Sequence, residues 1–263
     1  MRESRPFREF PCVTAIVNTY KRPKLLKRAL DSVENQDFDD FEVIVIHDGP
    51  ADEETIEVCK ESADVFELTE VDFRFLALDE NSGYQCVPKN VAIWHARGDY
   101  IAYLDDDNEW TSNHLTVLVE AIEEGKVWPD FVYGRREYVI DEGCTRMNLH
   151  NGVSPFVPFA ENVQRLHNPS TNFIDTSDAL VAKGALWRLQ LATGKMWNEE
   201  YRRFGDWELF TRGVFFSGWR GKGVNAVVQK YHWHGENLQL TRPLTETPRR
   251  QRPGGISAAF ISG

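Results

Sequence analysis

Tyr100-Ile-Ala-Tyr-Leu104 runs directly into the acidic triplet Asp105-Asp106-Asp107. The first five residues are apolar or aromatic, as in a strand that is buried on both faces. Three successive carboxylates repel one another, and a divalent cation that bridges them to phosphate oxygens would offset their charge. A solvated acidic turn and a structural Ca²⁺ loop are the alternatives, although Trp110 stands where an EF-hand needs glycine.

Upstream of this stretch, short apolar runs alternate with helical periods. We expect strands at 13–17, 41–46, 73–78 and 100–104, and helices at 25–33, 53–62, 87–94 (capped by Gly98) and 112–124. This alternation predicts an α/β fold with a mainly parallel sheet and right-handed crossovers. Ligands bind outside the carboxyl ends of such strands, where Thr19, Asp48 and the acidic triplet all fall.

Beyond residue 125 the alternation loosens. We expect strands at 131–133 and 138–140 in a hairpin or meander, a long loop at 151–168, helices near 179–191 and 207–216, and a last strand at 224–228. Residues 241–263 have the composition of a flexible tail.

The composition is that of one sizeable globular domain. Of 263 residues, 41% are hydrophobic and 27% are charged. The net charge of −11 disfavours a broad nucleic-acid surface, which needs Lys and Arg against phosphates. The four cysteines are far apart, which predicts neither a zinc site nor a disulfide framework. With no apolar run that could span a bilayer and no signal peptide at the start, a cytoplasmic protein is expected.

Four pieces of sequence, in this order, resemble family 2 glycosyltransferases of the GT-A fold. They are Val13-Thr-Ala-Ile-Val-Asn-Thr-Tyr-Lys-Arg-Pro23, Val43-Ile-Val-Ile-His-Asp-Gly49, Asn81-Ser-Gly83 with Lys89-Asn90, and Gly98-Asp-Tyr-Ile-Ala-Tyr-Leu-Asp-Asp-Asp107. The resemblance covers roughly 12–124 and 170–240. It implies a single Rossmann-like GT-A domain over 1–240, with helices on both faces of the sheet. A nucleotide-sugar-binding half (11–124) would precede a smaller mixed acceptor-binding half (125–240).

The resemblance implies a donor site at the strand ends. Thr19, Tyr20 and Arg22 would line the nucleotide-base pocket, and Asp48 would accept a hydrogen bond from the base, as in proteins that use uridine diphosphate. Two simpler roles stay open: Tyr20 covering the edge of the sheet, and Asp48 capping the turn that follows it.

The rest of the donor site is implied in the same way. Gly83 and Lys89 belong to the matching segments, and Asp105 and Asp106 would lie near the ribose and the sugar. Asp107 would coordinate Mn²⁺ or Mg²⁺.

In the second half, Gly205-Asp206-Trp207-Glu208 resembles the catalytic segment of the family, with Gly205 in place of its usual acidic first residue. Asp206 would be the general base that takes the proton of the acceptor hydroxyl, giving inversion at the anomeric carbon. Alternatively Asp206 is the N-cap of the following helix, which would lower its pKa and make it a weaker base.

His232 and His234 alternate on a predicted strand, so both imidazoles could face one ligand. By resemblance His234 would complete the metal site, and His232 would be a neighbour or an ordinary surface residue.

Two further features bear on sugar binding. Among eight tryptophans, we expect only one to stack on a sugar, and the candidates beside the proposed site are Trp110, Trp207 and Trp233. Asp175-Thr-Ser-Asp178 either borders the acceptor site or caps a helix.

The resulting prediction is an inverting, metal-dependent transfer of a sugar from a nucleoside-diphosphate sugar, with a UDP-sugar as the donor. The alternative is a non-catalytic nucleotide-sugar or carbohydrate binder with a retained GT-A fold. A phosphohydrolase or nucleotidyltransferase is disfavoured, because the chain has neither a second carboxylate cluster nor a phosphate-binding glycine loop. The acceptor stays open among a glycan, a lipid-linked sugar, a protein and a modified nucleic-acid base, as does the oligomeric state.

Overall fold

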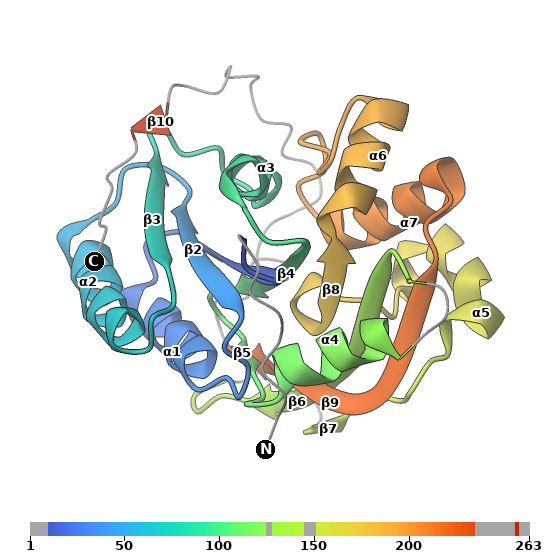
Figure 1. Ribbon diagram of the computed structural model, residues 1–263, viewed down its shortest axis with the longest axis horizontal. Coiled ribbons are helices and arrows are strands. Elements are labelled where there is room, and N and C mark those ends of the chain that lie inside the picture. The colour runs from blue at the N-terminus through green and yellow to red at the C-terminus, as the bar shows by residue number, and fades with distance from the viewer. Residues whose placement is uncertain (1–9, 125–127, 145–150, 235–255, 258–263) are drawn as a thin grey trace.

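One continuous sheet organises the molecule (Figure 1). The computed structural model describes residues 10–124, 128–144, 151–234 and 256–257. The strand order in the ten-stranded sheet is β10-β3-β2-β1-β4-β8-β6-β9-β5, with β7 paired to β6. Within the described residues, no helix is both long enough and apolar enough to cross a membrane.

The first half is the predicted alternation of strands and helices. Its elements are β1 (Val13–Thr19), α1 (Pro23–Glu34), β2 (Phe41–His47), α2 (Glu53–Leu68), β3 (Phe73–Leu78), α3 (Cys86–His95), β4 (Tyr100–Asp105), β5 (Glu109–Trp110) and α4 (His114–Glu123). Strands β1 to β4 are parallel, with β1 between β2 and β4. Their carboxyl ends therefore share one edge of the sheet, which is where the acidic triplet lies.

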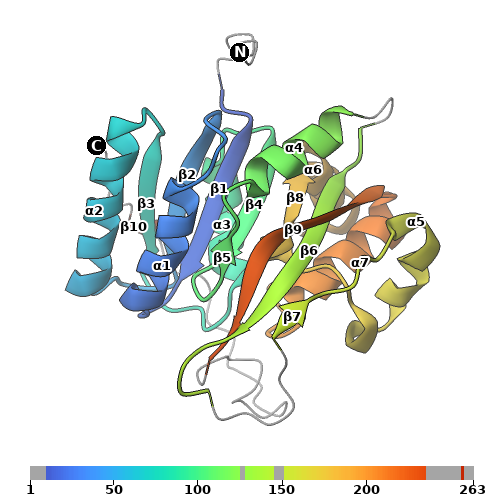
Figure 2. The same ribbon diagram turned by 90° about the horizontal axis from the view of Figure 1, so that it is seen from below.

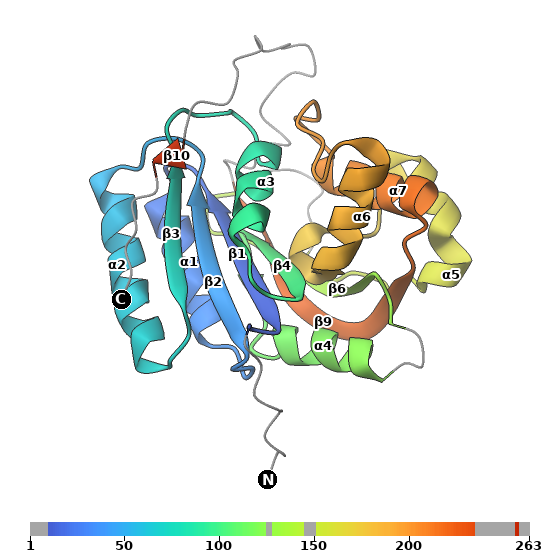
Figure 3. The ribbon, with the colours of Figure 1, turned by 45° about the horizontal axis from the view of Figure 1, so that its top comes forward.

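The two faces of the sheet are covered by different helices. Along β1, Ala15 and Val17 pack into the core under α1, α2 and α4, whereas Ile16 packs into the core on the opposite face under α3. The same alternation in β2 follows from the period of two in a strand, and it explains why both faces of these strands are apolar. Figure 3 shows α1 and α3 on opposite sides of this part of the sheet.

The second half extends the same sheet with mixed strands. Its elements are β6 (Phe131–Ile140), β7 (Gly152–Val153), α5 (Phe159–Asn162), three 3₁₀ turns (Val163–His167, Pro169–Thr171 and Thr176–Asp178), β8 (Ala179–Ala182), α6 (Lys183–Thr193), α7 (Gly205–Ser217), β9 (Gly221–Trp233) and β10 (Ile256–Ser257). Strand β8 runs antiparallel to both β4 and β6, while β9 runs parallel to β6. Figure 2 shows the long strands β6 and β9 side by side.

Several sequence-based boundaries were wrong in this half. The two predicted strands at 131–133 and 138–140 are one strand, β6, whose register against β9 shifts around Arg135. The predicted helix at 179–191 begins only at Lys183, because its first four residues form β8 between two other strands. The predicted loop at 151–168 contains β7, α5 and a 3₁₀ turn. The tail from residue 241 lies almost entirely outside the described residues.

Gly98 is not the cap of α3, which ends at His95 with Ala96 in an extended conformation. A Cβ atom at position 98 would lie 2.5 Å from the backbone nitrogen of Thr14. Glycine is therefore needed there because the chain passes directly against β1, and the Thr14 hydroxyl accepts a hydrogen bond from the Gly98 N–H (2.9 Å).

Candidate active site

The three carboxylates at the carboxyl end of β4 point to three different sets of partners. Asp105 Oδ1 lies 2.8 Å from Lys89 Nζ. The fully buried Asp106 accepts a hydrogen bond from the Thr19 hydroxyl (2.7 Å) and forms an ion pair with Arg22. Asp107 Oδ2 lies 3.1 Å from Arg22 Nη1. The mutual repulsion of the triplet is thus offset within the protein by two cations, one of which is shared.

Burial sets the ionisation of the triplet. It raises the pKa of Asp106 to about 7 against the opposing charge of Arg22. Burial alone would also raise the pKa of Asp107, but its hydrogen bond with His234 and the charge of Arg22 lower it. Of this pair, Asp107 is the stronger acid and the more accessible, because 16% of its side chain is exposed whereas the Asp106 side chain is fully buried.

Lys89 is fully buried beneath the triplet. Its ammonium group contacts Asp105 and the Gln85 side chain (2.6 Å), and it lies 4.8 Å from the centre of the Trp197 ring. Lys89 therefore holds the Asp105 carboxylate in place from inside the protein.

His234 and His232 turn to different carboxylates. His234 Nε2 lies 3.2 Å from Asp107 Oδ2. His232 is buried instead between Asp141 (Nδ1 to Oδ1, 2.5 Å) and Glu109 (Nε2 to Oε1, 2.7 Å). The expectation that both imidazoles could reach one ligand was wrong, because strand β9 ends at Trp233 and His234 lies beyond it.

Asp48 is held by the turn that follows β3. Its two carboxylate oxygens accept hydrogen bonds from the Asn81 amide (3.0 Å), from the Ser82 N–H and hydroxyl (2.9 and 2.6 Å) and from the Gly83 N–H (3.1 Å). Gly83 has φ +82°, a conformation that favours glycine. Asp48 therefore caps this distant turn rather than the one after it. Burial nevertheless raises its pKa.

Two aromatic rings flank the strand ends near Asp48. The Tyr20 ring, 38% exposed, lies 5.5 Å from the His47 ring. The His47 Nε2 atom accepts a hydrogen bond from the Lys21 N–H (3.2 Å), so His47 anchors the loop between β1 and α1. The exposed part of Tyr20 is a surface on which a base can stack.

Asp206 lies in the first turn of α7 and is not its N-cap. The helix starts at Gly205, and the residue before it, Phe204, has φ +57° and no capping side-chain bond. Asp206 Oδ2 accepts a hydrogen bond from the Asn172 amide (3.2 Å). Burial and the nearby charge of Asp175 raise the pKa of Asp206 to about 6, whereas a capping role predicted a lowered value.

Gly205 is close-packed against α3. A Cβ atom there would lie 3.0 Å from Cys86 Sγ and 3.4 Å from the Trp197 ring. An acidic side chain at this position would therefore meet these two buried groups.

Most of these elements lie within a segment that matches a known protein family. The family model "Glycosyl transferase family 2" matches residues 14–189, which is more than half of the chain. The chain belongs to glycosyl transferase family 2.

Two curated relatives illustrate the similarity. WcaA of Escherichia coli (strain K12), named as a glycosyl transferase of colanic acid biosynthesis, is 27% identical over 231 residues, covering 88% of this chain and 76% of WcaA. The GalNAc(5)-diNAcBac-PP-undecaprenol beta-1,3-glucosyltransferase of Campylobacter jejuni is 32% identical over 118 residues, covering 44% of this chain and 36% of that protein.

Solved structures share the GT-A fold with this glycosyltransferase. Residues 1–349 of S. aureus TarS, in complex with UDP-GlcNAc, superpose with a TM-score of 0.66 at 18% identity, covering 88% of this chain and 61% of that one. A mannosyltransferase from Pyrobaculum calidifontis, in complex with GDP-Man and Mn²⁺, gives a TM-score of 0.58 at 21% identity, covering 84% and 56%.

Sequence reasoning missed Arg136, which organises the second half of the site of this family 2 glycosyltransferase. Arg136 lies 2.6 Å from Asp178 Oδ2 and 3.5 Å from Asp175 Oδ2, and it donates a hydrogen bond to the Phe173 carbonyl (3.2 Å). Asp175 also caps the 3₁₀ turn after it through the Ser177 N–H (2.9 Å), as one of its two predicted roles required. Arg136 thereby fixes the segment that places Asp175 and Asn172 beside Asp206.

The candidate tryptophans are engaged with the protein. Trp110 is buried, stacks on His114 (4.2 Å between ring centres) and donates a hydrogen bond to the Ser177 carbonyl (3.0 Å). Trp207 donates to the Leu166 carbonyl (2.7 Å). Trp233, half-buried, stacks with Tyr138 and is the one of the three beside His234.

Proposed function

We propose that this glycosyltransferase moves a sugar from a nucleoside-diphosphate sugar to an acceptor hydroxyl with inversion, using a divalent metal and Asp206 as general base. The observation that carries the proposal is the contact of Asp107 Oδ2 with His234 Nε2, 3.2 Å apart at the carboxyl end of β4. This pairing of a carboxylate with an imidazole, contributed by distant parts of the chain, faces the edge of the sheet where ligands bind in such folds.

The residues fit a Mn²⁺ or Mg²⁺ ion whose remaining ligands come from the substrate. Carboxylate oxygen and imidazole nitrogen are both ligands for these metals, and Mg²⁺ in particular takes few protein ligands together with substrate phosphates. Within the described residues, no three His, Cys, Asp or Glu side chains form a complete metal cage. Asp107 and His234 would hold the ion. When bound, the ion supplies Lewis-acid stabilisation of the charge on the nucleoside-diphosphate leaving group.

The protein groups prepare the donor end of the reaction. Lys89 holds Asp105, and Arg22 and Thr19 hold Asp106, so that the loop after β4 presents Asp107 in a fixed position. Asp105, with 28% of its side chain exposed, is placed to contact the sugar or ribose, and Tyr20 to stack on the base. Asp48 shapes the base pocket through the turn at 81–83.

Asp206 performs the proton transfer. The acceptor oxygen attacks the anomeric carbon, the bond from that carbon to the diphosphate oxygen breaks, and Asp206 takes the hydroxyl proton. A carboxylate with a pKa of about 6 is ionised at neutral pH and is a stronger base than an ordinary aspartate. Asn172 orients its Oδ2 atom. This basicity favours an enzyme over a non-catalytic binder.

A UDP-sugar is the proposed donor. TarS binds UDP-GlcNAc and the Pyrobaculum enzyme binds GDP-Man with Mn²⁺, so both nucleotides occur on this fold. The resemblance in sequence implies that Tyr20 and Asp48 bind uridine. The position of both residues at the strand ends supports this choice of donor. We further propose that residues 11–124 form the donor half and 125–240 the acceptor half.

Calorimetric titration of the chain with UDP, GDP and dTDP, each with Mn²⁺ and with EDTA, tests the proposal. Metal-dependent binding of UDP that Asp107→Ala abolishes is the expected result. The matched control is Asp31→Ala, a half-exposed aspartate on α1 that pairs with Lys27, which should leave binding unchanged. Absence of binding for all three nucleotides, with a folded protein, would contradict the proposed function.

A further inference from the structure

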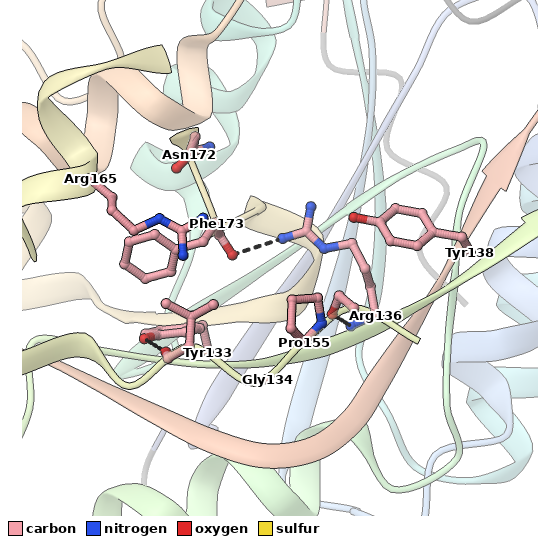
Figure 4. A pocket seen from close by; sticks show the side chains of 10 residues that line it. Tyr133, Gly134, Arg136, Tyr138, Pro155, Arg165, Asn172 and Phe173 are labelled. Carbon is pink, nitrogen blue, oxygen red and sulfur yellow. Dashed lines mark hydrogen bonds between the residues drawn. The ribbon is translucent and has the colours of Figure 1, made fainter. Parts of the chain in front are cut away.

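A cavity of about 140 Å³ opens close to Asp206, because the Asn172 side chain that lines it is bonded to that residue. Figure 4 shows the side chains that line this cavity. Two of its lining residues, Asn172 and Arg136, belong to the catalytic surroundings described above: Asn172 bonds Asp206, and Arg136 holds Asp175. A molecule in this cavity would therefore lie one side chain away from the proposed general base. If the proposed function holds, this is the place of the acceptor.

The two charged side chains that line the cavity are both cations. The lining includes two guanidinium groups, Arg136 and Arg165, and none of its ten residues is an aspartate or a glutamate. A cavity whose charged lining residues are all cations is unusual in a chain with a net charge of −11. The charge of Arg136 is already compensated by Asp178 and Asp175.

Among the residues that the structure describes, Arg165 has no carboxylate partner. Its guanidinium carbon lies 5.2 Å from the centre of the Phe173 ring, and it forms no ion pair with any residue that the structure describes. Arg165 is an exposed residue, and Figure 4 shows its guanidinium group against the Phe173 ring at the cavity. Stacking on an aromatic ring orients the planar group and leaves its N–H donors available.

We infer that this cavity selects acceptors that carry an anionic group, a sugar carboxylate or a phosphate, and that Arg165 binds that group. Arginine matches both oxyanions with a pair of parallel N–H donors. The Tyr138 side chain and the Asn172 amide supply further polar and aromatic surface for the sugar ring. This inference rests on the proposed function, because it assigns the class of acceptor for the same reaction.

The probes are methyl β-glucuronide, glycerol 3-phosphate and the neutral methyl β-glucoside, with binding measured by ligand-observed NMR titration. We expect the protein to bind at least one anionic probe about tenfold more tightly than the glucoside. Whichever anion binds more tightly identifies the carboxylate or the phosphate as the recognised group. The preference should weaken as salt is added.

Two variants at Arg165 and one elsewhere assign the effect to this residue. Arg165→Ala should abolish the preference, and Arg165→Lys should keep part of it. Arg220→Ala removes the same charge from an exposed arginine that does not line this cavity and should leave the preference intact. Equal binding of all three probes, no binding of either anion, or a preference that survives in Arg165→Ala would overturn the inference.

The nucleotide titration described above separates the two proposals. Metal-dependent UDP binding without an anion preference would leave the transfer proposal standing and overturn the cavity assignment alone. An Arg165-dependent anion preference without any nucleotide binding would keep the anion site but contradict its use as an acceptor site.

Discussion

Asp107 and His234 meet at 3.2 Å although 127 positions separate them in the chain. The contact joins the loop after β4, in the middle of the sheet, to the residue that follows β9. The proposed metal site is therefore complete only when the second half of the chain has folded onto the first.

The two histidines near this contact should respond differently to the same substitution. His234→Gln should abolish the Mn²⁺ dependence of nucleotide binding, because a ligand beside Asp107 is lost. His232→Gln should preserve that dependence but lower the free energy of unfolding by about 2 kcal/mol, since the partly buried hydrogen bond to Asp141 and the contact with Glu109 are lost. Calorimetry with and without EDTA, together with guanidinium denaturation, measures both effects. Loss of metal dependence in both variants would contradict the assignment.

Replacing Asp206 by asparagine should reduce turnover by at least about 100-fold while leaving nucleotide binding unchanged. The base acts only when it is deprotonated, and its pKa is raised to about 6. The rate of the wild-type enzyme should therefore be constant above this pH and fall as the pH is lowered through about 6. Product formation followed from pH 5 to 8 checks the profile, and unchanged turnover in Asp206→Asn would remove Asp206 from the mechanism.

Asp48→Ala should destabilise the protein by about 2 kcal/mol, because the donors of the turn at 81–83 lose a buried acceptor. Nucleotide affinity should fall as well, since this turn borders the proposed base pocket. Asp79→Ala, at an exposed position just before the turn, is the control and should be neutral. Denaturation curves and UDP titrations measure the two effects, and a fully stable Asp48→Ala protein would refute the capping role.

Introducing the acidic residue of the family pattern at position 205 should destabilise the protein by about 1–3 kcal/mol, because the new side chain meets Cys86 and Trp197. Gly184→Glu, near the start of α6 where a Cβ atom would have space, should cost less than about 0.5 kcal/mol. The double variant Gly205→Glu with Cys86→Ala should be more stable than the sum of the single effects predicts. Additive effects in this double-mutant cycle would show that the contact with Cys86 is not the cause.

The first half of the fold could be predicted from sequence because its signals are local. Strands such as 41–46 are apolar on both faces, and the helix containing Leu26, Ala29 and Leu30 shows its buried side directly in its spacing. The position of the strand ends could also be predicted, since parallel strands place their carboxyl ends at one edge of the sheet. Helix α2 still continues to Leu68, well past the predicted end at 62, because residues 63–68 contain no glycine or proline that would mark its end.

The second half depends on long-range contacts that local patterns do not contain. Ala179–Ala182 suits a helix by composition, but it forms a strand because β4 and β6 offer hydrogen bonds on both sides. The role of Arg136 could not be predicted, because its partners lie in a loop about 40 residues away and an arginine in a strand has no specific signature. Local patterns likewise do not contain the left-handed conformation of Phe204, which places Asp206 in the first turn of α7 and not at its N-cap.

The continuous sheet has a consequence for how the enzyme handles its substrates. Because β8 is hydrogen-bonded to β4 on one side and to β6 on the other, the two halves cannot swing apart as separate bodies. We therefore expect the distances between the donor end and Asp206 to be set before any substrate arrives. Adjustment on binding is then confined to short segments at the strand ends, such as the turn at 81–83, and little orientational freedom is lost when the reacting atoms meet.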